Sequence, residues 1–282
     1  QGVRPAAAPP PRSTAARVIT AIVAVLLIAG TVTLYLVIAH AHPVTDPDDL
    51  AGILSSYAGM GLLVCLIFAI LSGPIIRGLV RLVRALPFAG TAGFLASREA
   101  SARPRLTQAL VVPITLAAAA VGIMAAWINE LTNVMAAQAG SEEKVNAPPR
   151  QMALLLGGPV IVACVCASAI VFATASHRRA DNALLLVSGV TPGVIRAKAL
   201  VEAGIHAVIC LVCAYGIVVV NDVSMAKALS TGPVPSVPIL APGWQAAGVV
   251  AVGIALTLLL LLAVTADGMH RNPVTTITGG HQ

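Results

Sequence analysis

Six apolar blocks, each 22 to 24 residues long, dominate the chain. At about 1.5 Å per residue, a helix of that length crosses the roughly 30 Å hydrocarbon core of a bilayer. Only 10% of the 282 residues are charged, against about a quarter in a soluble domain. The sequence therefore predicts an all-α, polytopic membrane protein with six transmembrane helices, at residues 18–40, 51–73, 106–128, 152–175, 199–220 and 244–266.

The basic residues predict how these spans are oriented. Fourteen Lys and Arg residues fall in segments that share one side of the membrane, and three fall on the other side, at Lys144, Arg150 and Lys227. Because cytoplasmic loops carry the excess of Lys and Arg, both termini are expected in the cytoplasm. The net charge of +6 is thus a topology signal, and no basic and aromatic patch points to nucleic acid. The high Ala, Gly, Val and Arg content suggests a bacterial source, so we expect the protein in the bacterial plasma membrane.

The predicted spans divide the chain into five parts. These are a Pro- and Ala-rich cytoplasmic tail or linker, a two-helix membrane segment, a cytoplasmic amphipathic linker, a four-helix core and a cytoplasmic tail, at residues 1–17, 18–73, 74–105, 106–266 and 267–282. In the third part, Arg77, Arg81 and Arg84 share one helix face, which predicts a surface helix that binds lipid headgroups or, as the alternative, a protein. The chain begins with Gln1 and not Met, so we expect the C-terminal part of a larger protein.

The stretch SHRRADNALLLVSGVTP, residues 176–192, follows the fourth span and is too short to cross the bilayer again. Asp181 suits the start of a helix, Gly189 its end, and Thr191 with Pro192 the start of the next helix. The pattern predicts a short helix lying flat at the cytoplasmic face. Its apolar residues outnumber one membrane-facing stripe, which favours contact with a partner protein. A simple elbow packed on lipid and on its own bundle is the alternative.

This stretch resembles the cytoplasmic coupling helix of the FtsX/MacB-like permeases, which are membrane subunits of a class of ABC transporters. Two departures are Asp181 in place of the usual Glu and Leu186 where the family often has Arg. The matching coupling-helix residues are Arg178, Arg179, Asp181, Ala183, Leu184, Leu185, Gly189 and Thr191, with Arg196 and Glu202 as supporting residues in the next helix.

Two further stretches carry the resemblance over residues 94–277. The basic, Pro-containing segment from Arg98 to Leu110 is similar to the start of the family's first core helix. The segment from Asp267 to Ile277 is similar to its closing tail with Arg and Pro. The family's usual large extracellular domain is replaced here by a loop at residues 129–151.

The resemblance implies a permease subunit that converts ATP-driven movement of a partner ATPase into export or transmembrane mechanical signalling. The chain has no G-x-x-x-x-G-K-[ST] phosphate-binding loop, so ATP hydrolysis is expected in a separate subunit, and we assign no catalytic, cofactor-binding or metal-binding residue. The implied partners are a cytoplasmic ABC ATPase, the lipid bilayer and a second permease copy or half. The alternatives are a non-transport membrane scaffold for a cytoplasmic factor and a proton-coupled secondary transporter.

An ionisable pair in the fifth span bears on the last alternative. Glu202 and His206 are four residues apart and therefore share a helix face. Ionisable groups inside a membrane are functional candidates by default. Because Glu202 matches a position of the family that the chain resembles, we favour a structural tie between Glu202 and Arg178 or Arg179 over a proton relay. Few other polar residues line the predicted spans, which argues against a secondary transporter.

Two groups of possible metal ligands have simpler interpretations. Cys210 and Cys213 form a C-x-x-C without a second pair of ligands, and we expect them to pack as small apolar side chains. His40 and His42 precede three aspartates and could form a weak metal site, but a solvated polar loop is favoured.

Overall fold

The structure is a computed structural model that describes residues 14–39, 47–85, 90–138, 149–230 and 244–270. All of the regular structure within these ranges is α-helical. In chain order the helices are α1 (Thr14–Ala39), α2 (Pro47–Ala85), α3 (Gly90–Ala102), α4 (Pro104–Gln138), α5 (Pro149–Val187), α6 (Pro192–Ser230) and α7 (Trp244–His270).

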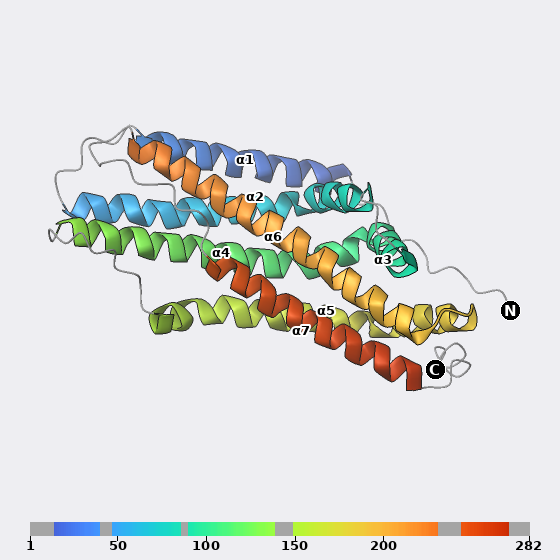
Figure 1. The fold of residues 1–282 in the computed structure, drawn as a ribbon. Coiled ribbons are helices and arrows are strands. Elements are labelled where there is room, and N and C mark those ends of the chain that lie inside the picture. The colour runs from blue at the N-terminus through green and yellow to red at the C-terminus, as the bar shows by residue number, and fades with distance from the viewer. Residues whose placement is uncertain (1–13, 40–46, 86–89, 139–148, 231–243, 271–282) are drawn as a thin grey trace.

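Six of these helices form an elongated bundle, and α3 lies at one end of it (Figure 1). The start of α1 and the end of α7 lie at this same end, which we call the α3 end. The junctions from α3 to α4 and from α5 to α6 lie there as well. Charged residues of three different helices therefore come together at the α3 end of an otherwise apolar bundle.

The central element is α4, which packs against α2, α5, α6 and α7. Of the apolar part of α4, 67% is buried, against 6% for the apolar part of α1. The run Ala117–Ala119 is buried, and small side chains of this kind let neighbouring helices approach closely. The core is completed by apolar residues of α6, notably Ile205, Ile209 and Ile217.

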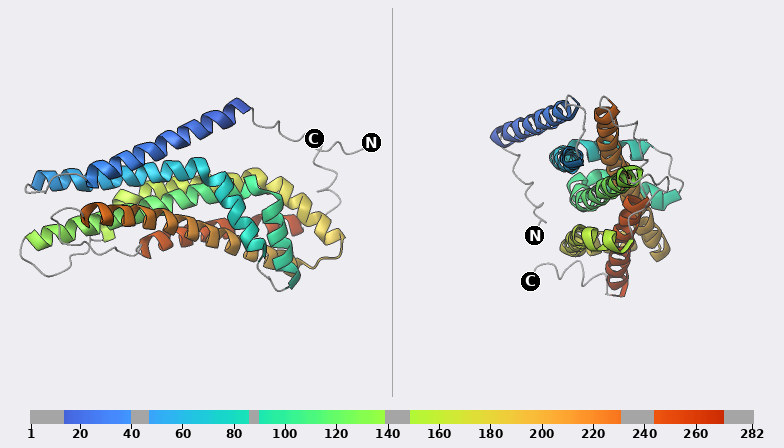
Figure 2. Two further views of the ribbon diagram at one scale, coloured as in Figure 1. Left: turned by 90° about the horizontal axis from the view of Figure 1, so that it is seen from above. Right: turned by 90° about the vertical axis from the view of Figure 1, so that its left-hand side faces the viewer.

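At the edge of the bundle, α1 diverges from the other helices and leaves most of its apolar surface uncovered (Figure 2). Its principal neighbours are α2 and α6. Val25 and Leu26 illustrate the exposure, with 64% and 65% of their surface accessible. A face of this kind is stable in hydrocarbon and costly in water, which agrees with a membrane environment.

The predicted spans are confirmed in part. Four stretches are long and apolar enough to cross a membrane, and they correspond to the first, second, third and fifth predictions: Val18–Val37, Gly59–Ala85, Pro104–Ile128 and Pro192–Ser224. A fifth is present if bent α5 counts as one span, and α7 contributes a shorter apolar stretch, Ala247–Leu260. The described residues thus form a polytopic helical membrane protein, and the count of six spans stays a prediction.

The prediction that the second span ends at residue 73 and a separate linker helix follows is wrong. Instead, α2 continues as one helix through Pro74 to Ala85. Proline lacks the N–H that the helix interior needs, but membrane helices tolerate it where neighbouring groups satisfy the freed backbone. The predicted basic face survives this correction, because Arg77, Arg81 and Arg84 are all exposed on the last turns of α2.

The prediction of a separate helix starting at Asp181 is also wrong. The backbone stays helical from Pro149 to Val187, and the direction changes by 50° between residues 160–175 and 180–187. Asp181 therefore does not occupy a helix N-terminus. The predicted short segment exists as the last two turns of α5 beyond this bend, and we call residues 180–187 the α5 end segment.

One close contact between α2 and α4 depends on a glycine. A Cβ atom added to Gly61 would lie 2.7 Å from Cγ2 and 3.0 Å from Cδ1 of Ile123. Real Cβ atoms do not approach other carbons so closely. Gly61 is therefore required for the observed packing of α2 on α4.

We expect Gly61→Ala to lower the free energy of unfolding by about 1 to 3 kcal/mol, the usual cost of overpacking a core. Denaturation of the purified chain in detergent measures the effect. Gly78→Ala is the matched control on the same helix, since a Cβ there meets nothing within 4 Å. The control should be neutral or slightly stabilising because alanine is the better helix former. Equal losses in the two variants would contradict the close approach at Gly61.

Candidate partner-docking site

The α5 end segment is joined to α6 by a tight turn that Gly189 makes possible. The amide of Val190 donates to the carbonyl of Leu185, and the amide of Gly189 to that of Leu186, each at 3.0 Å. This is the Schellman arrangement that closes helix C-termini, and it needs a positive φ at the residue after the cap. Gly189 has a φ of 91°, so the predicted glycine stop is confirmed.

The next helix starts where the sequence predicts. Pro192 is the first residue of α6, a position where its missing N–H costs nothing. The carbonyl of Thr191 accepts the first helical hydrogen bonds, from Val194 at 3.0 Å and Ile195 at 3.3 Å. Because the turn between α5 and α6 has both ends defined by hydrogen bonds, it holds the two helix ends together.

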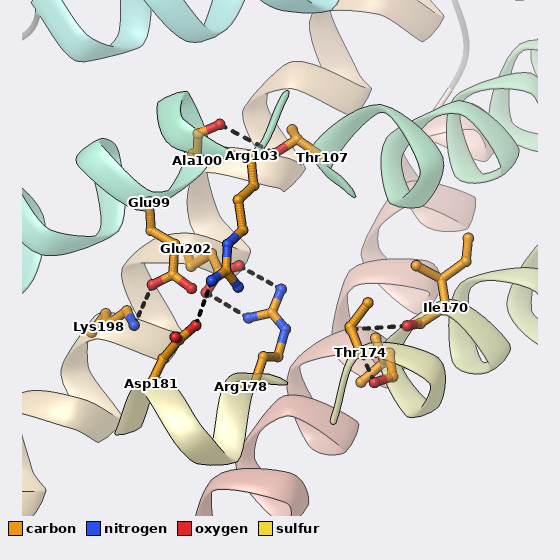
Figure 3. A network of polar contacts seen from close by, with 11 residues as sticks. Glu99, Ala100, Arg103, Thr107, Ile170, Thr174, Arg178, Asp181, Lys198 and Glu202 are labelled. Carbon is orange, nitrogen blue, oxygen red and sulfur yellow. Dashed lines mark hydrogen bonds and ion pairs between the residues drawn. The ribbon is translucent and has the colours of Figure 1, made fainter. Parts of the chain in front are cut away.

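A buried ion pair joins the same two helices. Nη1 of Arg178 donates to one carboxylate oxygen of Glu202 at 3.0 Å, and Nη2 donates to the other at 2.8 Å (Figure 3). The two side chains are 9% and 6% exposed. Bidentate, charge-assisted contacts of this kind are stronger and geometrically more specific than neutral hydrogen bonds. The predicted tie between Glu202 and Arg178 is present, and Glu202 has no need of a proton-relay role to explain its burial.

Two further ion pairs bring α3 into the same cluster (Figure 3). Glu99 of α3 pairs with Lys198 of α6. Arg103, between α3 and α4, pairs with Asp181 of the α5 end segment at 2.8 Å, in a more exposed position. The three ion pairs together connect the C-terminal part of α5, α3 and the first three turns of α6.

The α5 end segment presents an apolar surface beside this cluster. Leu184 and Val187 are 58% and 67% exposed, whereas Ala183 is buried. Next to them is an open cleft of about 590 Å³ between the α5 end segment, α3 and α6. Its lining combines Leu95, Leu184 and Leu185 with Ser188 and charged side chains of both signs, namely Arg98, Glu99, Arg103, Asp181 and Lys198. The site can therefore offer a partner both apolar contact and charged groups.

The residues predicted for docking fall into two groups. Leu184, Gly189, Thr191 and Arg196 are exposed, and Leu185 is half-buried in the cleft wall. In contrast, Arg178, Ala183 and Glu202 are buried and hold the segment in place. Asp181 is half-buried in its pair with Arg103. Arg179 lies within α5, and its side chain is outside the described residues, as is the closing tail around Pro273.

Sequence reasoning assigned no docking role to Glu99, Arg103 or Lys198. The one sequence feature that could have drawn attention to Glu99 is that it is a single acid, next to Arg98, in a basic segment. Its partner Lys198 lies 99 residues later in the chain, so no local pattern could reveal the pair. The contribution of α3 to the site is consequently a finding of the structure.

The structure also shows where some of the other residues singled out in the sequence lie. His206 is 2% exposed one turn beyond Glu202, and within the described residues its Nδ1 has no hydrogen-bond partner. Cys210 and Cys213 lie in the hydrophobic core, in agreement with the packing interpretation. Among the residues that the structure describes, no three His, Cys, Asp or Glu side chains gather as metal ligands. His40 and His42 lie outside those residues.

Comparison of the chain with protein-family models, with curated proteins and with solved structures finds no match. The interpretation of the site therefore depends on its own geometry. That geometry is a short helical segment with an exposed apolar surface, connected through buried charges to a long helix that crosses the bundle.

Removing Glu202 should be far more costly than removing Asp181. We expect Glu202→Ala to lower the free energy of unfolding by about 3 to 5 kcal/mol, because it leaves the Arg178 guanidinium buried without its carboxylate. Asp181→Ala should cost at most about 1 kcal/mol, since the Arg103–Asp181 pair is exposed to solvent. Chemical denaturation in mixed micelles measures both changes.

A double variant separates loss of the pair from loss of packing. Arg178→Met combined with Glu202→Leu replaces both charges with apolar side chains, and it should recover most of the stability that Glu202→Ala loses. A double variant no more stable than Glu202→Ala alone, or equal costs at Glu202 and Asp181, would show that the buried pair is not the critical contact.

Proposed function

We propose that this chain is the membrane subunit of an ABC transporter of the FtsX/MacB-like type, with the α5 end segment as the surface on which a cytoplasmic ATPase docks. The observation that carries the proposal is the combination of exposed Leu184 and Val187 on the α5 end segment with the buried Arg178–Glu202 pair that joins α5 to α6. An apolar contact surface without such an anchor could bind a partner. A surface anchored to a long helix can also pass on the movement of that partner.

The proposed mechanism is mechanical. The partner ATPase closes on ATP and pushes the α5 end segment. The displacement passes to α6 through the Gly189 turn and the Arg178–Glu202 pair, and to α3 through Arg103 and Glu99. Since α6 runs the length of the bundle and packs on α4, movement at the α3 end reaches the far end of the membrane region. The output is export of a substrate or a mechanical signal across the membrane.

Orientation and assembly belong to the same proposal. The α3 end faces the cytoplasm of a bacterial cell, and both termini lie on that side. A second permease copy or half completes the transporter, because a dimeric ATPase presents two docking surfaces. The nucleotide is bound and hydrolysed by the ATPase subunit alone.

The test is capture of the ATPase encoded beside this chain. We expect wild type to co-purify with the ATPase and to stimulate its hydrolysis of ATP, and Leu184→Glu to lose at least tenfold of the capture, because it places a charge at the centre of an apolar contact. Leu184 is 58% exposed, so the substitution should leave folding intact. Leu82→Glu, on the last turns of α2 and 63% exposed, is the matched control.

Other outcomes would distinguish the alternatives. A folded wild type that binds no ATPase but captures another cytoplasmic protein through Leu184 would favour the membrane scaffold. Transport that depends on a proton gradient and is lost in His206→Gln would favour the secondary transporter. Equal capture by wild type and Leu184→Glu would remove the α5 end segment from the docking surface.

A further inference from the structure

A groove of about 320 Å³ separates α2 from α4 on the outside of the bundle. It opens outwards, since Leu62 and Leu66 on its edge are 64% and 44% exposed. The side chains that line it are apolar or cysteine and carry no charge; they include Leu62, Cys65, Leu66, Leu116, Ala120 and Met124. A groove of this composition, within the membrane-crossing parts of both helices, suits a hydrocarbon chain.

Contacts between α2 and α4 define both ends of the groove. At the end far from α3, Gly61 lies against Ile123, and the two helices meet there. At the end near α3, Nε2 of Gln108 donates to Oγ of Ser72 at 2.9 Å. The lining of the groove is apolar or cysteine and reaches Ala69 of α2 on the α3 side, and the Ser72–Gln108 contact lies about one helical turn beyond it.

A glycine on the α3 side of the groove lies beneath two polar side chains. A Cβ atom on Gly73 would lie 3.4 Å from Oε1 of Gln108 and 3.6 Å from Nη2 of Arg77. The half-buried Gln108 amide and the Arg77 guanidinium therefore both lie over the bare backbone of Gly73. Arg77 itself is exposed, so its charge is available to a ligand that approaches from the membrane.

The groove and the charges lie on one face of α2. Leu66, Gly73, Arg77 and Arg84 follow each other at intervals of seven, four and seven residues, which places them in line along a helix. Pro74 does not interrupt this line, because α2 continues to Ala85. A ligand lying along this face would contact apolar side chains first and arginines last.

The length of this face matches one leaflet of a bilayer. From Gly61 to Arg77 the helix rises about 24 Å, at 1.5 Å per residue. Half of a bilayer, headgroups included, measures about 20 to 22 Å. Within the apolar stretch Gly59–Ala85 of α2, the groove residues lie toward the Gly59 side and Arg77 lies further toward α3.

We propose that this groove binds a phospholipid with an anionic headgroup, drawn from the leaflet at the α3 end. One acyl chain lies between α2 and α4, and the headgroup phosphate accepts hydrogen bonds from Arg77 and from the Gln108 amide. Arg84, on the same face, adds positive charge beyond the phosphate. Basic pockets between membrane helices are suited to anionic lipid headgroups. The proposal is independent of the ATPase partner.

Native mass spectrometry of the full chain in detergent tests the proposal, with dioleoylphosphatidylglycerol and dioleoylphosphatidylcholine as probes. Wild type should retain the anionic lipid more tightly than the zwitterionic one. Arg77→Gln should weaken retention of the anionic lipid about fivefold, which is what one arginine near the membrane surface contributes. Ala69→Phe, which fills the groove from α2, should displace both lipids; Ala120→Phe fills it from α4 and provides a second variant should the first not fold.

Two controls match these substitutions elsewhere on the molecule. Arg196→Gln removes an exposed arginine at the α3 end, and Val165→Phe enlarges a side chain that is 62% exposed on α5. Both should retain lipid as wild type does. Unchanged retention in Arg77→Gln, equal losses in the controls, or no preference for the anionic lipid would overturn the proposal. It would also fail if Ala69→Phe separated a dimer without changing the bound lipid, since a helix of a second copy would then occupy the groove.

Discussion

The buried pair of Arg178 and Glu202 is the contact on which the arrangement at the α3 end depends. Taking two charges out of water costs several kcal/mol for each ion, and a close, well-aligned pair offsets that cost. The bidentate contact provides this alignment at Nη1 and Nη2 of Arg178, although its buried Nε has no hydrogen-bond partner among the described residues. The contact is formed only when α5 and α6 stand in one register. The bend in α5, the turn at Gly189 and the position of Leu184 are all compatible with that register.

The rest of the bundle gives this contact a rigid support on one side and an adaptable edge on the other. The central helix α4 packs closely on α2, α5, α6 and α7, partly through small side chains. Because α6 is one of these neighbours, a movement of α6 displaces the helices packed around it. At the opposite extreme, α1 and the outer face of α2 leave much of their apolar surface uncovered by protein. The proposed force transmission belongs to the packed part, and the proposed lipid binding belongs to the open part.

Local sequence patterns predicted a large share of this structure. The apolar blocks predicted membrane-spanning helices because hydrocarbon requires every backbone group to be paired within the helix. Gly189 and Thr191-Pro192 predicted the turn between α5 and α6, since both preferences arise from backbone geometry alone. The same reasoning failed at Pro74 and Asp181, where helices continue. At Pro74 the local signal was outweighed by the packing of α2 on α4 and α6. At Asp181 the helix α5 continues, and the Asp181 side chain is held by Arg103.

What the sequence by itself determined is the class of molecule, the approximate position of most spans, and the tie between Glu202 and a neighbouring arginine. Only the tertiary structure decided that α3 takes part in the candidate site, because the Glu99–Lys198 pair joins residues far apart in the chain. It also decided that an apolar groove lies between α2 and α4, with Gln108 and Arg77 beside Gly73 on its α3 side. Periodicity reports which face of a helix is apolar, but which helix meets that face is determined by close packing in three dimensions.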